Sequence, residues 1–180
     1  SKTAQKPIAM IITCCDSRIL ENTMFGGNIG DYFIHRNIAN IVPSKNDSDK
    51  NIQTLSAIEY AIKVLKIPNL IILGHSNCGG VEYSYKTLLD KKNINDFEYT
   101  NQWTSCLQNS YNNIPNNLLE NEKITFFEQE NIKQSIKNLR EYNFIDKAIN
   151  ENKLHVVGLW YQINSGLIKY LDNNSFIELD

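Results

Sequence analysis

The chain has 180 residues, of which 42% are hydrophobic and 21% charged, and its formal net charge is -2. This balance is typical of a soluble globular protein that buries a core, and it excludes a disordered chain. Lys and Arg are scattered, and no apolar run approaches the ~18 residues of a membrane span, so neither nucleic acid nor a membrane is an expected partner.

No internal repeat and no Gly/Ser-rich linker divides the sequence, so residues 1–180 are interpreted as one domain. The first residues, Ser1 to Pro7, are polar and do not form a signal peptide. We therefore expect a cytoplasmic protein, with a removed targeting segment as the open alternative.

Four short apolar runs predict the strands of a central sheet. Each run is continuous rather than alternating, which indicates strands covered on both faces, as in a parallel sheet. The runs are Ile8 to Thr13, Asp31 to Arg36, Asn69 to Gly74 and Leu154 to Leu159.

Apolar residues at helical spacing predict helices between and after these strands. The first predicted helix has Thr54 as its N-cap and ends before Pro68. The C-terminal region is expected to form a helix followed by an edge strand at Phe176 to Leu179. The apolar positions of the four helices are Leu55, Ile58, Ile62 and Leu65; Ile132, Ile136 and Leu139; Phe144, Ile145 and Ile149; and Ile163, Leu167 and Leu171.

The segment Asn93 to Glu122 differs from the rest because it holds nine Asn and its apolar residues show no steady period. We interpret it as an insertion of loops and short helices. It either packs on a partner subunit or forms a solvated surface excursion.

The alternation of strands and helices predicts an α/β fold. Its mostly parallel central sheet has about four strands in the order 2-1-3-4, with a possible extra edge strand, and helices flank it. Ligands bind at the carboxyl ends of such strands, where the strand order reverses. Two clusters lie there: Cys14, Asp16 and Arg18 follow the first strand, and His75 and Cys78 follow the third.

These clusters carry the donors that zinc prefers. Catalytic zinc sites commonly have three protein ligands, and Cys14, His75 and Cys78 supply two sulfurs and one imidazole. His-x-x-Cys alone is a weak signal, and a single Cys at a strand end is usually a small buried hydrophobe. Because each cluster follows a predicted strand of the same sheet, coincidence is a poor explanation. Two disulfides among the four cysteines are the less favoured alternative.

The sequence resembles the β-class carbonic anhydrases from about Gln5 to Leu171. The motifs that carry this resemblance are Cys14-x-Asp16-x-Arg18, His75-x-x-Cys78-Gly79-Gly80, Arg36-Asn37-Ile38-Ala39-Asn40, Ser56 to Ala61, and Gly158 to Gly166. Five motifs in the family's order make the resemblance specific. The family usually has one or two helices before the first strand, whereas here only residues 1–7 precede Ile8, so those helices are expected to be short or missing.

The resemblance implies one Zn²⁺ per chain on Cys14, His75 and Cys78. It makes Asp16 and Arg18 a catalytic dyad in which Arg18 holds the carboxylate away from the metal. It also implies a substrate pocket formed by Gln5, Phe33, Ile38, Tyr60, Gly79 and Gly80.

The activity implied by the resemblance is reversible hydration of CO2 to bicarbonate and a proton by zinc-bound hydroxide. A homodimer or higher homo-oligomer is expected, with each active site at the subunit interface. Two alternatives stay open: a zinc hydrolase of CS2 or COS on the same scaffold, and a non-catalytic binding module stabilised by zinc.

Overall fold

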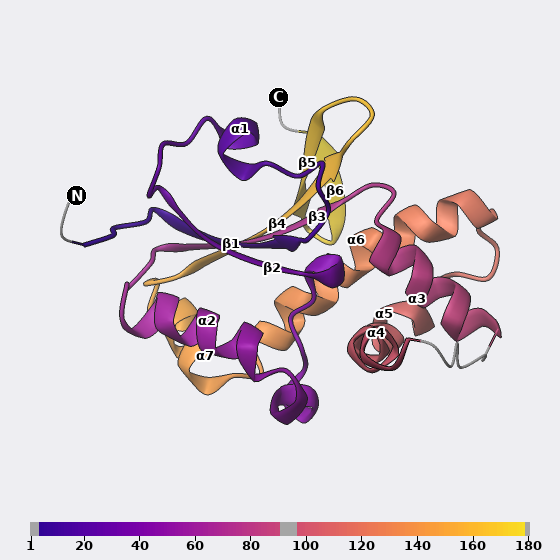
Figure 1. Cartoon of the computed structure of the whole chain (residues 1–180), viewed down its shortest axis with the longest axis horizontal. Coiled ribbons are helices and arrows are strands. Elements are labelled where there is room, and N and C mark those ends of the chain that lie inside the picture. Colours follow the sequence, from indigo (N-terminus) through magenta and orange to yellow (C-terminus); the bar gives the residue numbers. More distant parts are fainter. Residues whose placement is uncertain (1–3, 91–96, 179–180) are drawn as a thin grey trace.

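A six-stranded sheet lies at the centre of the computed structural model, which describes residues 4–90 and 97–178 (Figure 1). Its strand order is β2-β1-β3-β4-β5-β6, with parallel pairing among the first four strands and antiparallel pairing of β5 and β6. The strands are β1 (Ala9–Cys14), β2 (Tyr32–Asn37), β3 (Asn69–His75), β4 (His155–Gln162), β5 (Leu167–Asp172) and β6 (Ser175–Glu178).

Helices connect the parallel strands and cover the sheet. The α-helices are α1 (Glu21–Phe25), α2 (Ile52–Lys63), α3 (Gly79–Asp90), α4 (Glu98–Thr104), α5 (Gln108–Asn112), α6 (Glu120–Leu139) and α7 (Asn143–Asn150). Three 3-10 turns, η1 (Ile38–Asn40), η2 (Lys45–Lys50) and η3 (Ser105–Leu107), complete the described elements. Within the described ranges, no helix has the length and apolar character needed to cross a membrane.

The core lies on both faces of the sheet because successive side chains of a strand point to opposite sides. Met10 and Ile12 of β1 face the layer that holds α2, α6 and α7. Ile11, between them, joins Ile19 and Leu159 on the opposite face, where α1 and the β5 strand pack. Figure 1 shows α1 on one side of the sheet and α2 and α7 on the other.

The order of β1 and β3 brings two segments that are far apart in the sequence side by side. The two strands run parallel with Ile11 opposite Ile71, and the Thr13 hydroxyl donates to the Leu73 carbonyl at 3.0 Å. The chain leaves β1 toward β2 on one side and leaves β3 toward β4 on the other, which is the reversal point of an α/β sheet. The carboxyl ends of β1 and β3 therefore form one edge.

The predicted α/β fold and the order 2-1-3-4 are confirmed, and the sheet has six strands rather than about four. The first three strands lie within one residue of their predicted bounds, while β4 continues to Gln162. The predicted edge strand at 176–179 corresponds to β6, and Leu179 lies outside the described residues.

The predicted helix through Ile163, Leu167 and Leu171 is wrong, because this region is a β-hairpin. Gly166 has a φ of 74° and closes a turn in which its N–H donates to the Gln162 carbonyl. The four-residue spacing of Ile163, Leu167 and Leu171 suggested a helix. In the strand β5, however, successive side chains point to opposite faces of the sheet, and Ile168 packs in the core on the α1 side.

The structure contradicts the predicted role of Thr54 and confirms the short helices predicted for 93–122. Thr54 is not an N-cap, since α2 begins at Ile52, and its hydroxyl instead shares a 3.0 Å hydrogen bond with His35 Nε2. The predicted insertion at 93–122 does consist of short helices, α4, η3 and α5, before α6 begins at Glu120. Residues 93–96 of that segment lie outside the described residues.

Candidate metal centre

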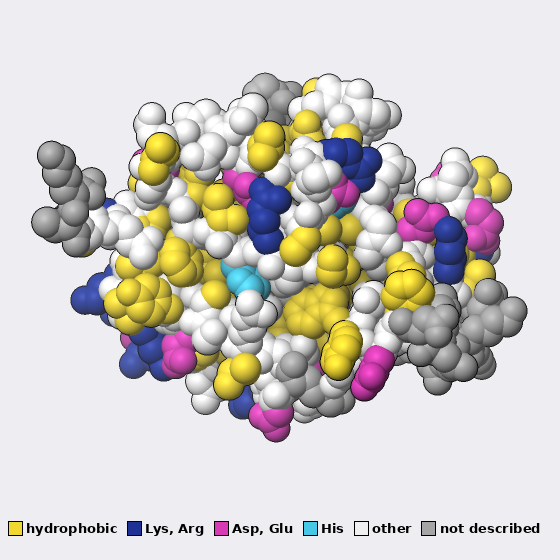
Figure 2. Space-filling view, in the orientation of Figure 1, with side chains coloured by type: hydrophobic (Ala, Val, Ile, Leu, Met, Phe, Trp, Pro, Cys, Tyr) yellow, Lys and Arg dark blue, Asp and Glu magenta, His cyan; other side chains and the backbone are white. Residues whose placement is uncertain are grey.

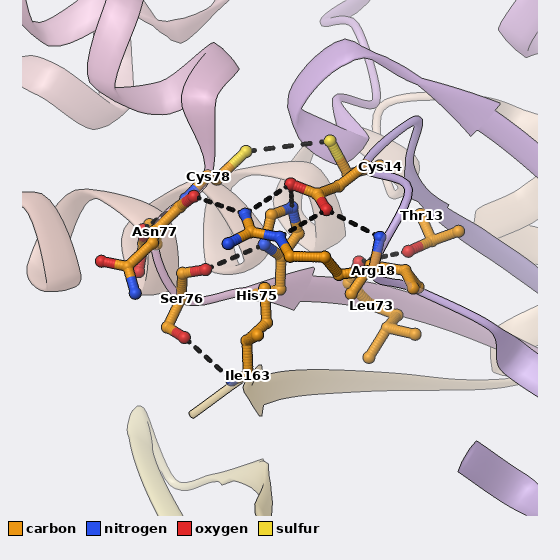
Figure 3. A network of polar contacts seen from close by, with 12 residues as sticks. Thr13, Cys14, Arg18, Leu73, His75, Ser76, Asn77, Cys78 and Ile163 are labelled. Atoms are coloured by element: carbon orange, nitrogen blue, oxygen red, sulfur yellow. Dashed lines mark hydrogen bonds and ion pairs between the residues drawn. The ribbon is translucent and has the colours of Figure 1, made fainter. Parts of the chain in front are cut away.

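Three donor side chains meet where β1 and β3 end. Cys14 is the last residue of β1, His75 is the last residue of β3, and Cys78 comes directly before α3. One ligand atom from each lies within 4.8 Å of the other two, and the two sulfurs are 3.8 Å apart. All three side chains are buried, and Figure 3 shows the sulfurs of Cys14 and Cys78 facing each other above the His75 ring.

The donor set fits a zinc ion. His75 Nδ1 lies 3.0 Å from the Ser76 carbonyl, which only accepts, so Nδ1 carries the ring proton and Nε2 presents a lone pair. Nε2 is buried and has no hydrogen-bond partner among the described residues. A buried acceptor beside two sulfurs is costly unless a cation satisfies it, and zinc takes this combination of thiolate and imidazole.

One of the two sulfurs, that of Cys14, is already prepared as a thiolate ligand. A hydrogen bond with the Cys78 thiol lowers the pKa of Cys14 to about 4, and the same contact raises the pKa of Cys78. Backbone N–H groups of Ala39 and Asp16 also lower the pKa of Cys14. The first backbone N–H groups of α3 lower the pKa of Cys78, as expected at a helix N-terminus. Thiolate is the form that binds a metal.

Gly80 allows α3 to approach η1 beside the sulfurs. A Cβ at position 80 would lie 2.5 Å from Ile38 Cγ2 and 3.3 Å from the Ala39 backbone nitrogen. A Cβ on Gly79 would meet nothing within 4 Å. The two glycines of the motif therefore differ, and only Gly80 is required by packing.

Asp16 and Arg18 form a two-pronged ion pair next to the cluster. Arg18 Nε donates to Asp16 Oδ1 at 2.8 Å and Nη2 donates to Oδ2 at 2.7 Å. The Arg18 hydrogen bonds lower the pKa of Asp16 to about 2. Asp16 Oδ2 remains 3.8 Å from His75 Nε2. The carboxylate thus lies beside the ligands while Arg18 occupies both of its oxygens.

The six predicted pocket residues separate into two groups. Ile38, Gly79 and Gly80 lie at the metal end of the sheet. Phe33 and Tyr60 stack with ring centroids 6.1 Å apart, and Tyr60 lines a cavity of about 540 Å³ together with Gln5. Gln5 precedes β1, whose six residues alone extend ~20 Å toward the metal end. The structure does not bring Gln5 to the metal cluster of its own chain.

All four cysteines are free thiols, so the disulfide alternative is wrong. Cys15 is exposed, and Cys106 accepts a 3.5 Å hydrogen bond from Asn51 Nδ2. Neither belongs to the cluster of side chains, among the described residues, that could hold a metal ion.

The sequence reasoning missed a row of buried polar residues on α6. Glu128 accepts the Cys78 backbone N–H at 3.0 Å, and Asn131 donates to the Ala39 carbonyl at 2.7 Å. Burial raises the pKa of Glu128 to about 7, against the opposing hydrogen bond from Cys78. Glu128, Asn131, Ser135 and Asn138 follow a 3-4-3 spacing and are all buried. That spacing was the signal in the sequence for a polar stripe facing a loop.

Comparison with known proteins places this geometry in a family. The family model described as Carbonic anhydrase matches residues 9–168. A carbonic anhydrase of Helicobacter pylori strain J99 is 31% identical over 173 residues, covering 93% of this chain and 77% of that protein. Beta carbonic anhydrase 3 of Arabidopsis thaliana is 30% identical over 166 residues, covering 91% of this chain and 64% of that protein.

Solved structures agree. The β-carbonic anhydrase CcaA superposes with a TM-score of 0.89 at 28% identity, covering 99% of this chain and 86% of that one. A tetrameric β-carbonic anhydrase of Sordaria macrospora gives a TM-score of 0.81 at 32% identity, covering 99% and 85%. The chain belongs to the β-class carbonic anhydrase family.

Proposed function

We propose that this protein catalyses the reversible hydration of CO2 to bicarbonate and a proton, with one zinc ion per chain bound by Cys14, His75 and Cys78. The observation that carries the proposal is the Asp16–Arg18 ion pair beside a cluster of three ligands. A structural zinc site normally has four protein ligands and needs no such pair.

When bound, zinc supplies Lewis acidity that lowers the pKa of water and makes hydroxide available near neutral pH. The residues of the chain orient the reactants around it. Arg18 occupies both oxygens of Asp16 and thereby keeps this carboxylate from becoming a fourth ligand. Arg18 also holds the pKa of Asp16 at about 2, so the carboxylate stays ionised at neutral pH.

The walls of the site suit a small uncharged substrate. Ile38 is 41% exposed and lies against Gly80 at the start of α3, so it offers an apolar surface close to the ligands. Arg18 contributes a guanidinium next to the segment between His75 and Cys78, where its Nη2 donates to the Asn77 carbonyl at 3.0 Å. The apolar wall matches CO2, and the fixed Asp16–Arg18 pair supplies a polar surface for bicarbonate.

We further propose a homo-oligomer in which the second group of pocket residues, Gln5, Phe33 and Tyr60, serves the metal centre of a partner subunit. Strand β2 is an edge strand of the described sheet. Figure 2 shows hydrophobic side chains spread over the middle of the face that carries β2 and α2. Exposed apolar residues of this region include Ile34, Ile38, Ile52 and Tyr60. The similar protein of Sordaria macrospora is described as tetrameric.

The test is exchange of ¹⁸O between CO2 and water, with zinc measured in the same sample. We expect one zinc per chain and rapid exchange, and Cys78→Ser should lose both. Zinc without exchange would overturn the proposal in favour of a non-catalytic module. Hydrolysis of CS2 or COS in place of CO2 exchange would favour the hydrolase alternative.

A further inference from the structure

A buried carboxylate lies directly behind the metal centre. Glu128 of α6 is 3% exposed, and its two oxygens have different partners. Oε1 accepts the backbone N–H of Cys78 at 3.0 Å, and Oε2 accepts the indole N–H of Trp160 at 3.3 Å. Within the described ranges, no Lys or Arg forms an ion pair with this carboxylate. A buried carboxylate without a cation is expensive, so a purely structural position would favour an apolar residue.

The segment from His75 to Cys78 needs to be held, because Asn77 has a φ of 54°. Residues other than glycine rarely adopt this left-handed backbone conformation. Three of its four residues are each held by a separate hydrogen bond. The Ser76 hydroxyl accepts the Ile163 N–H at 3.0 Å, and Arg18 Nη2 donates to the Asn77 carbonyl, as Figure 3 shows. The Glu128 carboxylate provides the third contact, at the backbone of the ligand itself.

We propose that Glu128 is a positioning residue that fixes the main chain of Cys78, so that its sulfur stays opposite Cys14 and His75. Trp160 holds the carboxylate in place through its second oxygen. The effect on the metal passes entirely through the Cys78 backbone, in the way that outer-shell partners orient metal ligands. The proposal rests on zinc being bound at this site, as the proposed function states.

The contacts explain why this position requires a carboxylate rather than an amide. Both neighbours of Glu128 are N–H donors, and a carboxylate offers an acceptor atom to each. The amide of Gln has one acceptor and one NH2 group, so Glu128→Gln sets an NH2 group against one of the two donors. Removing the Trp160 donor would let the amide oxygen turn to Cys78 without conflict. The two substitutions should therefore compensate.

The experiment measures zinc release to a chromogenic chelator from zinc-loaded wild type, Glu128→Gln, Trp160→Phe and the double variant. Glu130→Gln is the matched control: it lies on the same helix and pairs with Lys133 and Asn113. We expect Glu128→Gln to release zinc at least ~10-fold faster than wild type, within the range for outer-shell partners. Glu130→Gln should match wild type, and the double variant should release zinc no faster than Trp160→Phe.

Two results would overturn this role. One is equal release from Glu128→Gln and Glu130→Gln. The other is the same acceleration by Glu128→Gln in the Trp160→Phe background, which would indicate lost packing rather than a donor conflict. If Trp160→Phe does not fold, the comparison of the two Gln variants decides alone. Wild type that neither retains zinc nor exchanges ¹⁸O would instead overturn the proposed function.

Discussion

Arg18 donates two parallel hydrogen bonds to Asp16, from Nε to Oδ1 at 2.8 Å and from Nη2 to Oδ2 at 2.7 Å. A third bond, from Nη2 to the Asn77 carbonyl, ties the same guanidinium to the segment between His75 and Cys78. Only a planar fork with several donors can make this set of contacts at once. The ion pair is thus fixed relative to the ligands, although Arg18 itself is partly exposed.

Replacing Arg18 should convert Asp16 from a neighbour of the metal into a competitor for it. Arg18→Ala removes both side-chain hydrogen bonds to the carboxylate and leaves Oδ1 only the backbone N–H of residue 18. Oδ2 then has no donor from residue 18, and it is already 3.8 Å from His75 Nε2. We expect kcat/KM for CO2 hydration to fall at least ~10-fold by stopped flow, with zinc content unchanged. Asp16→Ala in the same background should recover part of the loss. Full activity of Arg18→Ala would remove Arg18 from the mechanism.

Gly80 and Gly79 should respond differently to the same substitution. Gly80→Ala places a methyl group 2.5 Å from Ile38 Cγ2 and forces η1 away from α3, whereas Gly79→Ala meets nothing within 4 Å. Overpacking of this kind destabilises by about 1 to 3 kcal/mol. Chemical denaturation should show that loss for Gly80→Ala and almost none for Gly79→Ala. Equal effects would mean that the neighbouring Ile38 moves freely.

Zinc should stabilise the fold, because it satisfies the buried Nε2 of His75 and both sulfurs. A ligand that binds only the folded state at ~1,000 times its Kd adds about 4 kcal/mol. Removing zinc with a chelator should therefore lower Tm, and adding it back should restore Tm. Cys14→Ser is the control, since its Tm should respond much less to zinc. A wild-type Tm unaffected by zinc would contradict this expectation.

His35 should make stability depend on pH. Burial lowers the pKa of His35 in the folded protein, so the unfolded chain binds a proton more readily. Its contribution to stability is complete above the unfolded pKa of ~6.5 and is lost as the pH falls below that value. Denaturation of wild type and His35→Gln at saturating zinc, at pH 5.5 and 7.5, isolates the contribution of His35 to the free energy of unfolding. The variant should lose less stability on acidification, and an identical loss would exclude His35 as the cause.

The sequence predicted the metal end of the sheet well because strong local signals met a general topological rule. The apolar runs before Cys14 and His75 marked two buried strands, and parallel strands carry their ligands at one edge. The order β2-β1-β3-β4 then placed both clusters together. The prediction of a C-terminal helix was wrong. The spacing of Ile163 and Leu167 suits a helix, but Gly166, between them, has a positive φ and closes a hairpin.

Glu128 could not be assigned from sequence for a different reason. Its role depends on α6 crossing the sheet so that one turn lies behind Cys78 and beside Trp160, residues 50 and 32 positions away. Nothing local fixes that placement, because the intervening insertion has no apolar period. In the same way, the separation of Gln5 from the metal of its own chain follows from the length and direction of β1.

That separation leads to the sharpest test of the oligomer. Gln5→Ala lacks the pocket residue but keeps its metal ligands, whereas Cys78→Ala lacks the metal site but keeps Gln5. If Gln5 serves the partner, a mixed dimer contains one complete site, made of the metal centre of one chain and Gln5 of the other. Refolding the two variants together in equal amounts should give complete sites at roughly a quarter of the wild-type number, since half of the dimers are mixed. Stopped-flow CO2 hydration should then exceed the summed activity of the separate variants. Activity that never exceeds this sum would place Gln5 outside the partner's site.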